Sequence, residues 1–147
     1  MGASPYWYYV AYRPEIDLAL NELRNREFNA GRYNPVIPFP EFPITEESPS
    51  PGAGHKSIEE ALSASKEDGT RSILDIDHIS EEMKYCAAAP LGEDTIEELY
   101  GTNKPTHTMV EEDMSFFDYV DRLMAIYIIL YEDDMPSEIL FAGYSAD

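Results

Sequence analysis

The sequence predicts a single α+β domain over residues 1–147, with a mostly antiparallel sheet of about five strands packed by several short helices. Two observations support this fold class. Helix-like and strand-like segments are mixed along the chain, and the last two strand-like runs form a β-hairpin. The length suits one hydrophobic core, and the 44% hydrophobic and 12% aromatic residues are typical of a folded protein.

The N-terminal part is expected to hold a strand followed by a helix. Residues 6–12 are an aromatic run of high β-propensity, apolar on both sides of its alternation, which predicts a central strand. Pro14 at a first-turn position begins a predicted helix that continues to about Ala30, and Gly31 ends it. One stripe of this helix is apolar, so it is expected to pack on the sheet.

A proline-rich extended arm and loop follow at residues 35–56. Six prolines between Pro35 and Pro51 exclude a regular helix. The apolar residues between these prolines predict that the first half lies against the domain, whereas residues 46–54 are expected to form a mobile loop. Residues 32–38 also fit a basic-x-x-Pro-x-x-Pro docking pattern, for which packing on the protein's own sheet is the preferred interpretation.

The middle of the chain predicts three short elements. Ser57 and Glu60 have capping-box spacing and begin a helix that Gly69 ends. Residues 71–79 alternate like a strand, and the apolar residues 84–90 predict another strand.

Helices and a hairpin are predicted for the remainder. Asp94 begins a short acidic helix that Gly101 ends, and residues 106–113 and 115–124 are two further helical candidates. Residues 125–132 and 137–144 predict a hairpin with a four-residue loop. Its apolar strands are expected to be central, covered, or paired across a dimer.

The predicted strand at residues 71–79 carries the most enzyme-like pattern. Asp75 and Asp77 would project from one face about 7 Å apart and could share a hard cation such as Mg²⁺. His78 would project from the opposite face. The blander interpretation is a solvated acidic face. The alternative function is therefore a small metal-assisted enzyme that uses Asp75 and Asp77.

Acidic residues are unevenly distributed along the chain. Residues 1–34 hold four acids and four bases, so residues 35–147 carry the whole net charge of −19. Such a surface repels nucleic acid phosphates and anionic membranes and attracts basic protein surfaces. The predicted partner-binding residues lie in two acidic clusters: Glu93, Asp94, Glu97 and Glu98, and Glu111, Glu112 and Asp113. Plain solubility and adaptation to high salt are alternative explanations of the charge.

The leading functional hypothesis is a non-enzymatic binding protein that engages a basic protein partner, in an inhibitor, immunity-type or nucleic-acid-mimic role. No phosphate loop, nucleophile elbow or zinc-protease motif occurs in the sequence, and no cofactor is expected. A third hypothesis is an oligomerising subunit that forms a homodimer through the C-terminal hairpin. The single cysteine, Cys86, and the absence of a signal peptide or membrane-spanning stretch predict a soluble, cytoplasmic protein.

Overall fold

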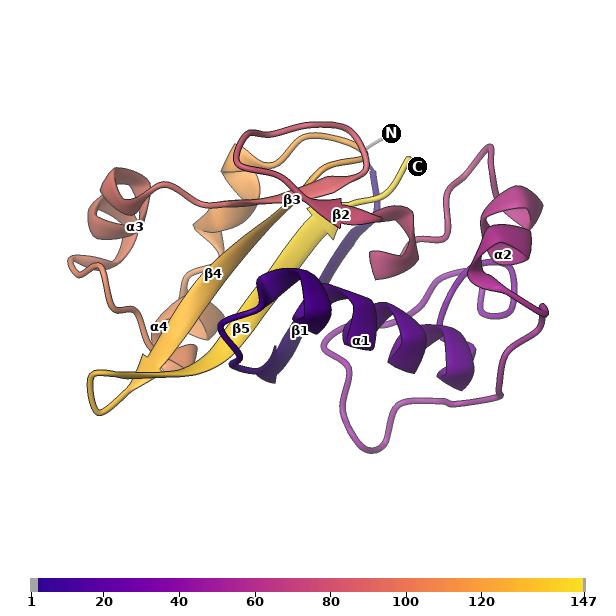
Figure 1. Ribbon diagram of the computed structural model, residues 1–147, viewed down its shortest axis with the longest axis horizontal. Coiled ribbons are helices and arrows are strands. Elements are labelled where there is room, and N and C mark those ends of the chain that lie inside the picture. The colour runs from indigo at the N-terminus through magenta and orange to yellow at the C-terminus, as the bar shows by residue number, and fades with distance from the viewer. Residues whose placement is uncertain (1–2, 147) are drawn as a thin grey trace.

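Five strands form one sheet in the computed structural model, which describes residues 3–146 (Figure 1). Their order across the sheet is β1-β5-β4-β3-β2. The strands are β1 (Pro5–Ala11), β2 (His78–Ile79), β3 (Ala87–Pro90), β4 (Ala125–Glu132) and β5 (Met135–Tyr144). β5 is antiparallel to both of its neighbours, whereas β3 is parallel to both β4 and β2. The α+β class and the strand number are confirmed, but the sheet is mixed rather than mostly antiparallel.

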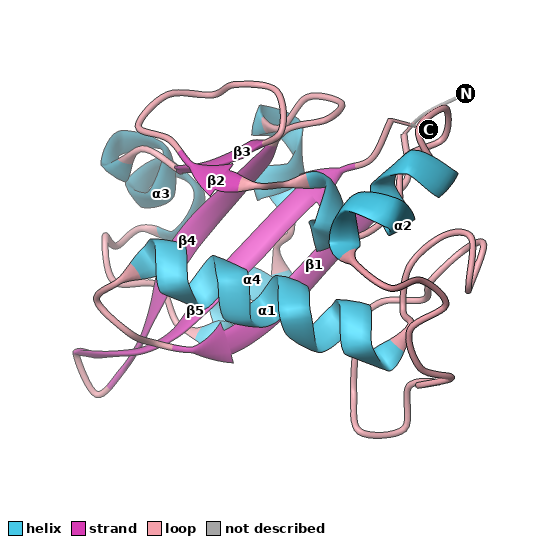
Figure 2. Cartoon of the chain, turned by 45° about the vertical axis from the view of Figure 1, so that its right-hand side comes forward, coloured by secondary structure: helices cyan, strands magenta, loops and turns pink. Residues whose placement is uncertain are grey.

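Helices cover both faces of the sheet (Figure 2). The long helix α1 (Ile16–Ala30) packs on one face, where Leu20 and Leu23 contact apolar residues of β1 and β5. The opposite face is covered by α3 (Glu93–Tyr100), α4 (His107–Glu112) and the 3₁₀ turn η2 (Ser115–Tyr119). A smaller cluster joins α2 (Ile58–Ala64) and the 3₁₀ turn η1 (Ile73–Asp75) to the C-terminal end of α1.

β1 is an edge strand, so the prediction of a central strand is wrong about its lateral position. Its side chains are nevertheless buried towards both faces of the sheet. Tyr6 and Tyr8 belong to the core under α1, and Trp7 and Tyr9 pack against the core under α3 and α4. A strand whose side chains are apolar on both sides is one that is covered on both faces of the sheet. Such a pattern does not show whether the strand has a neighbour on one edge or on both.

α1 confirms the predicted helix, and it begins at Ile16, two residues beyond Pro14. Gly31 ends it in the left-handed conformation, with φ of 74°, and its N–H donates to the Phe28 carbonyl. A residue without a Cβ adopts this conformation without steric cost, which is why glycine follows so many helices.

Residues 71–79 do not form the predicted strand. Arg71 adopts a positive φ of 53°, and the Ser72 side chain accepts from the Leu74 N–H and starts η1. Only the last two residues pair with β3, as β2. A short polar side chain that satisfies nearby backbone groups competes with the sheet ladder, and here the local hydrogen bonds prevail over the alternating pattern.

The other short helices largely agree with prediction. Ser57 caps α2, although that helix ends at Ala64 rather than near Gly69. Thr106 caps α4 as expected, and α3 ends at Gly101 but begins after Gly92 rather than at Asp94. The helix predicted over residues 115–124 is limited to the 3₁₀ turn η2.

The C-terminal hairpin is confirmed, with a tighter turn than predicted. β4 and β5 are joined by Asp133 and Asp134 alone, both with positive φ, of 51° and 64°. Two residues in this conformation match the twist of paired strands, and aspartate tolerates it better than most residues. Pro136 therefore lies within β5, beside a register shift after Leu130.

Both hairpin strands lie inside the sheet, as expected for strands this apolar. β5 pairs with β4 on one side and with β1 on the other, and β3 pairs with β4 from Ala125 to Tyr127. The Tyr131 N–H donates to the Pro105 carbonyl further along β4. These pairings occupy most of the hairpin's backbone edges, so edge pairing no longer supports a homodimer through the hairpin.

The proline-rich arm has no helix or strand between residues 31 and 57 and lies against the domain. Phe42 packs on Trp7 and Tyr8, with ring centroids 5.6 and 5.2 Å away. The loop predicted to be mobile contacts the end of α1, where the Gly52 N–H donates to the Ala30 carbonyl at 3.0 Å. The first half of the arm confirms the prediction that it packs on the domain.

Candidate functional site

The two predicted acidic clusters lie on neighbouring helices of one sheet face. Ile96 anchors α3 and Val110 anchors α4 in the same apolar core, and the Tyr100 hydroxyl of α3 donates to the Asp113 carbonyl at 2.8 Å. Folding thus brings together clusters that are separated by 13 to 20 positions in sequence. The predicted residues of both clusters are all solvent-exposed: Glu93, Asp94, Glu97, Glu98, Glu111, Glu112 and Asp113.

The part of the chain that contains these helices has almost no compensating positive charge. Residues 93–134 include twelve acids and only two bases, Lys104 and Arg122. Lys104 lies over the Tyr131 ring, with its nitrogen 5.9 Å from the ring centroid. Ser115 donates from its hydroxyl and its backbone N–H to Asp113, and these bonds lower the pKa of that carboxyl. These bonds therefore favour the ionised form of Asp113.

His107 ties the acidic helix α4 to the sheet, a role the sequence analysis did not assign. Its ring stacks on Tyr9 at 4.0 Å, and its nitrogens lie 2.8 Å from Glu138 and 3.3 Å from Glu111. Burial, followed by the charges of Glu111 and Glu138, raises the pKa of Tyr9 to about 12. The one sequence signal was the four-residue spacing of His107 and Glu111, which places them on one helical face.

Asp75 and Asp77 do not form the shared cation site that the predicted strand implied. Asp75 is buried at the end of η1, where its Oδ1 accepts from the Thr70 N–H at 2.9 Å. Asp77 is exposed and contacts the His78 ring at 2.5 Å. Within residues 3–146, no group of three or more His, Cys, Asp or Glu side chains could hold a metal ion. The strand geometry that motivated the metal-assisted hypothesis is therefore absent.

Replacing Asp75 with Asn should remove a pH-dependent part of the stability. Burial raises the pKa of Asp75, against hydrogen bonds from Thr70 that lower it. A raised folded-state pKa means that the folded protein holds the proton more tightly, so stability falls as pH rises from the unfolded value of about 3.9 through the folded value. Urea unfolding across this window should show Asp75→Asn gaining stability relative to the wild type as pH rises. A pH-independent difference would contradict this assignment.

Cys86 is half-buried rather than fully buried, and its surroundings do not activate it. Its thiol pKa is raised by burial and, to a smaller extent, by the charges of Asp77 and Asp75. Because the thiolate is the reactive form, a raised pKa lowers its nucleophilicity at neutral pH. This environment makes Cys86 a poor nucleophile.

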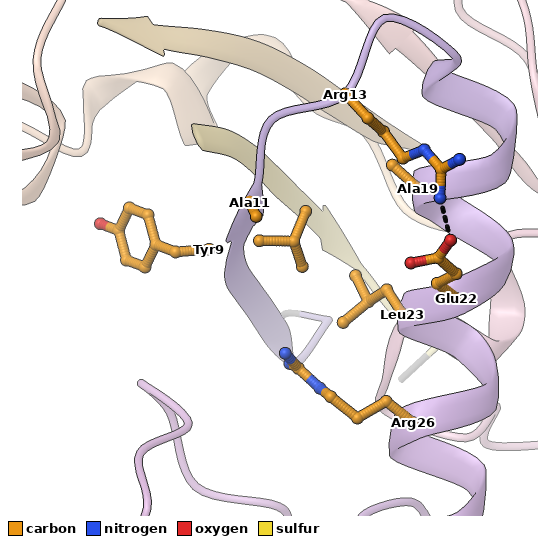
Figure 3. A pocket seen from close by; sticks show the side chains of 8 residues that line it. Tyr9, Ala11, Arg13, Ala19, Glu22, Leu23 and Arg26 are labelled. Atoms are coloured by element: carbon orange, nitrogen blue, oxygen red, sulfur yellow. Dashed lines mark hydrogen bonds and ion pairs between the residues drawn. The ribbon is translucent and has the colours of Figure 1, made fainter. Parts of the chain in front are cut away.

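Two cavities adjoin β1, one beside α1 and one beside the proline-rich arm. One, of about 420 Å³, lies between β1 and α1 and is lined by residues that include Ala11, Leu23 and Arg26 (Figure 3). The other, of about 410 Å³, lies between β1 and the proline-rich arm, with Trp7 and Ile44 in its lining. Tyr9 and Arg26 line both cavities, so the two adjoin at the middle of β1.

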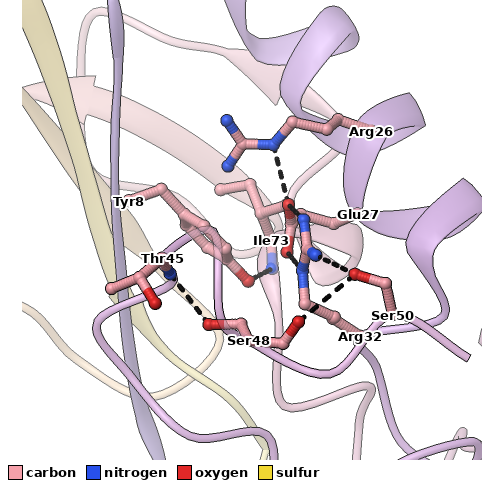
Figure 4. Close-up of polar contacts among 8 residues, drawn as sticks. All are labelled: Tyr8, Arg26, Glu27, Arg32, Thr45, Ser48, Ser50 and Ile73. Carbon is pink, nitrogen blue, oxygen red and sulfur yellow. Dashed lines mark hydrogen bonds and ion pairs between the residues drawn. The ribbon is translucent and has the colours of Figure 1, made fainter.

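A buried ion-pair cluster under the second cavity holds the arm to α1 (Figure 4). Glu27 is completely buried and accepts two hydrogen bonds from Arg32, at 2.8 and 2.7 Å, and one from Arg26 at 2.8 Å. The second terminal nitrogen of Arg32 donates to Ser50 of the arm at 2.7 Å. Nothing in the local sequence pattern distinguishes Glu27 from an exposed helical glutamate, so its burial could not be predicted from the sequence.

Comparisons with protein-family models, with curated proteins and with solved structures found no match to this chain. Among the residues that the structure describes, no helix is both long and apolar enough to span a membrane.

Proposed function

We propose that this protein is a non-enzymatic binding protein that engages a basic protein partner through the acidic face of α3 and α4. The observation that supports the proposal is the adjacency of the two acidic clusters, which places six exposed carboxylates on two neighbouring helices and a seventh, Asp113, directly after α4. An inhibitor, an immunity-type protein or a mimic of nucleic acid phosphates would each use such a surface.

The position of these carboxylates matters as well as their charge. Both helices are fixed to the sheet by buried side chains, Ile96 and Val110, so their backbone need not be ordered when a partner binds. A dense field of one sign accelerates the encounter with a partner of opposite sign, and salt weakens it. The expected binding is therefore fast and strongly dependent on ionic strength.

Matched charge variants test this proposal. In the face variant, glutamine replaces four glutamates of α3 and α4: Glu97, Glu98, Glu111 and Glu112. In the control variant, glutamine replaces four exposed glutamates of the arm and α2: Glu46, Glu47, Glu59 and Glu60. Both variants lose the same charge, so only its position differs.

The immobilised wild type and variants are incubated with lysate of the source organism at low ionic strength and eluted with a salt gradient. We expect one dominant basic protein to bind the wild type and the control variant, and to bind the face variant at least about tenfold more weakly when its affinity is measured. Equal loss of binding in both variants would mean that net charge alone attracts the partner. Binding that persists unchanged at high salt would also contradict the proposal.

A further inference from the structure

The outer edge of β1 presents unpaired peptide groups. The Tyr12 N–H donates to the Ser137 carbonyl, and the Ser145 N–H donates to the Ser4 carbonyl, so the even-numbered residues of this strand bond to β5. The peptide groups of Trp7, Tyr9 and Ala11 therefore point away from β5. Within residues 3–146, no second strand pairs with this edge. Such an edge is a template for an added strand.

Two cavities lie beside this edge, whereas Phe42 of the arm packs on Trp7 and Tyr8 towards its N-terminal end. The two cavities beside β1 adjoin at Tyr9 and Arg26, which makes one groove from Ala11 to Trp7. α1 lines the cavity next to Ala11, and residues 44–46 of the arm line the cavity next to Trp7. Proteins often protect an edge with a proline or a covering segment, but Pro5 and Pro14 lie at or beyond the ends of this groove.

Arg26 lines both cavities, while Glu22 lines the first and Glu46 lines the second. Arg32 is fully engaged with Glu27 and Ser50, and Arg13 pairs with Glu22 and Glu15. Arg26 uses only its Nε for Glu27, and its terminal nitrogens extend towards β1 without a hydrogen-bond partner among the described residues (Figure 3). Two such nitrogens match the geometry of a carboxylate.

We infer that the β1 edge is a docking site for an extended peptide segment with an acidic residue opposite Tyr9. The segment adds to the sheet as a sixth strand, its backbone pairs with Tyr9 and Ala11, and its carboxylate binds Arg26. Charge complementarity favours this occupant over a second copy of the chain. Antiparallel pairing of two β1 strands about Tyr9 would bring two Arg26 groups together between subunits that each carry −19.

The test selects binders from a random library of displayed twelve-residue peptides, using the full-length protein, and measures the best peptide by fluorescence anisotropy. Ala11→Pro removes an outward N–H from the edge, and Ala11→Val is its control because it keeps the N–H. Arg26→Gln removes the guanidinium, and Lys66→Gln removes the same charge from an exposed site away from the groove. Circular dichroism and urea unfolding verify that each variant is folded.

The selected peptides should combine β-branched or aromatic residues with an acidic residue at one constant position. We expect Ala11→Pro and Arg26→Gln each to weaken binding about tenfold or more, and the two controls to change it less than about twofold. Selected peptides that are basic, or that bind Ala11→Pro and wild type equally, would overturn the inference. A wild-type dimer that Ala11→Pro converts to a monomer in sedimentation would also overturn it, by identifying a second copy as the occupant.

Discussion

Replacing Glu27 with Gln should lower the free energy of unfolding by about 3–5 kcal/mol. Glu27 has no solvent exposure and accepts three hydrogen bonds from arginine side chains, two of them from Arg32. The amide keeps the volume of the carboxylate but removes its charge and replaces one acceptor with a donor. The Arg32 side chain, only 11% exposed, would then be left without its counter-ion. Urea unfolding followed by circular dichroism measures the change.

Glu22→Gln is the matched control on the same helix. Glu22 also pairs with an arginine, Arg13, but its side chain is 69% exposed, so its loss should cost no more than about 1 kcal/mol. A double-mutant cycle with Glu27→Gln and Arg32→Gln measures the interaction energy between these two side chains apart from their other contacts. If Glu27→Gln and Glu22→Gln cost the same, water reaches the Glu27 cluster and burial does not strengthen it.

The contrast between Glu22 and Glu27 shows which features of the structure can be predicted from local sequence. Glu22 and Glu27 occupy one helix, and both have arginines within reach, yet one is exposed and the other is completely buried. The difference arises because residues 44–50 of the arm fold back over Glu27. Local pattern predicted α1 and its end at Gly31, since those depend on neighbouring residues. The return of the arm depends on contacts that are distant in sequence.

The acidic face was predictable as a set of residues but not as a surface. Helical spacing and capping residues predicted α3 and α4, and composition located the charges. Their adjacency depends on Ile96 and Val110 entering the same core, which is a tertiary contact. The predicted site at Asp75 and Asp77 failed for a local reason, because the Ser72 side chain and the Asp75 carboxylate satisfy backbone N–H groups of their own segment.

Replacing Gly31 with Ala should lower the free energy of unfolding by about 2–4 kcal/mol. Two costs combine at this position. An L-residue at φ of 74° is strained, and a Cβ at Gly31 would lie only 2.1 Å from the Gly52 carbonyl oxygen. Relief of this clash requires the loop to move away, which breaks the bond from the Gly52 N–H to Ala30 and displaces Ser50 from Arg32. Urea unfolding measures the loss, and limited proteolysis should show faster cleavage within residues 46–54.

Gly101→Ala separates the two costs, because Gly101 ends α3 with nearly the same φ, 73°, and a Cβ there would meet nothing within 4 Å. It should cost about 1 kcal/mol, the strain of the left-handed conformation alone. The excess loss in Gly31→Ala then measures how firmly the loop is held against α1. Because residues 44–46 also line the cavity next to Trp7 in the β1 groove, a loosened arm should weaken peptide binding there as well. Equal costs for the two variants would mean that the loop yields freely and that the Glu27 cluster, rather than Gly31, determines the position of the arm.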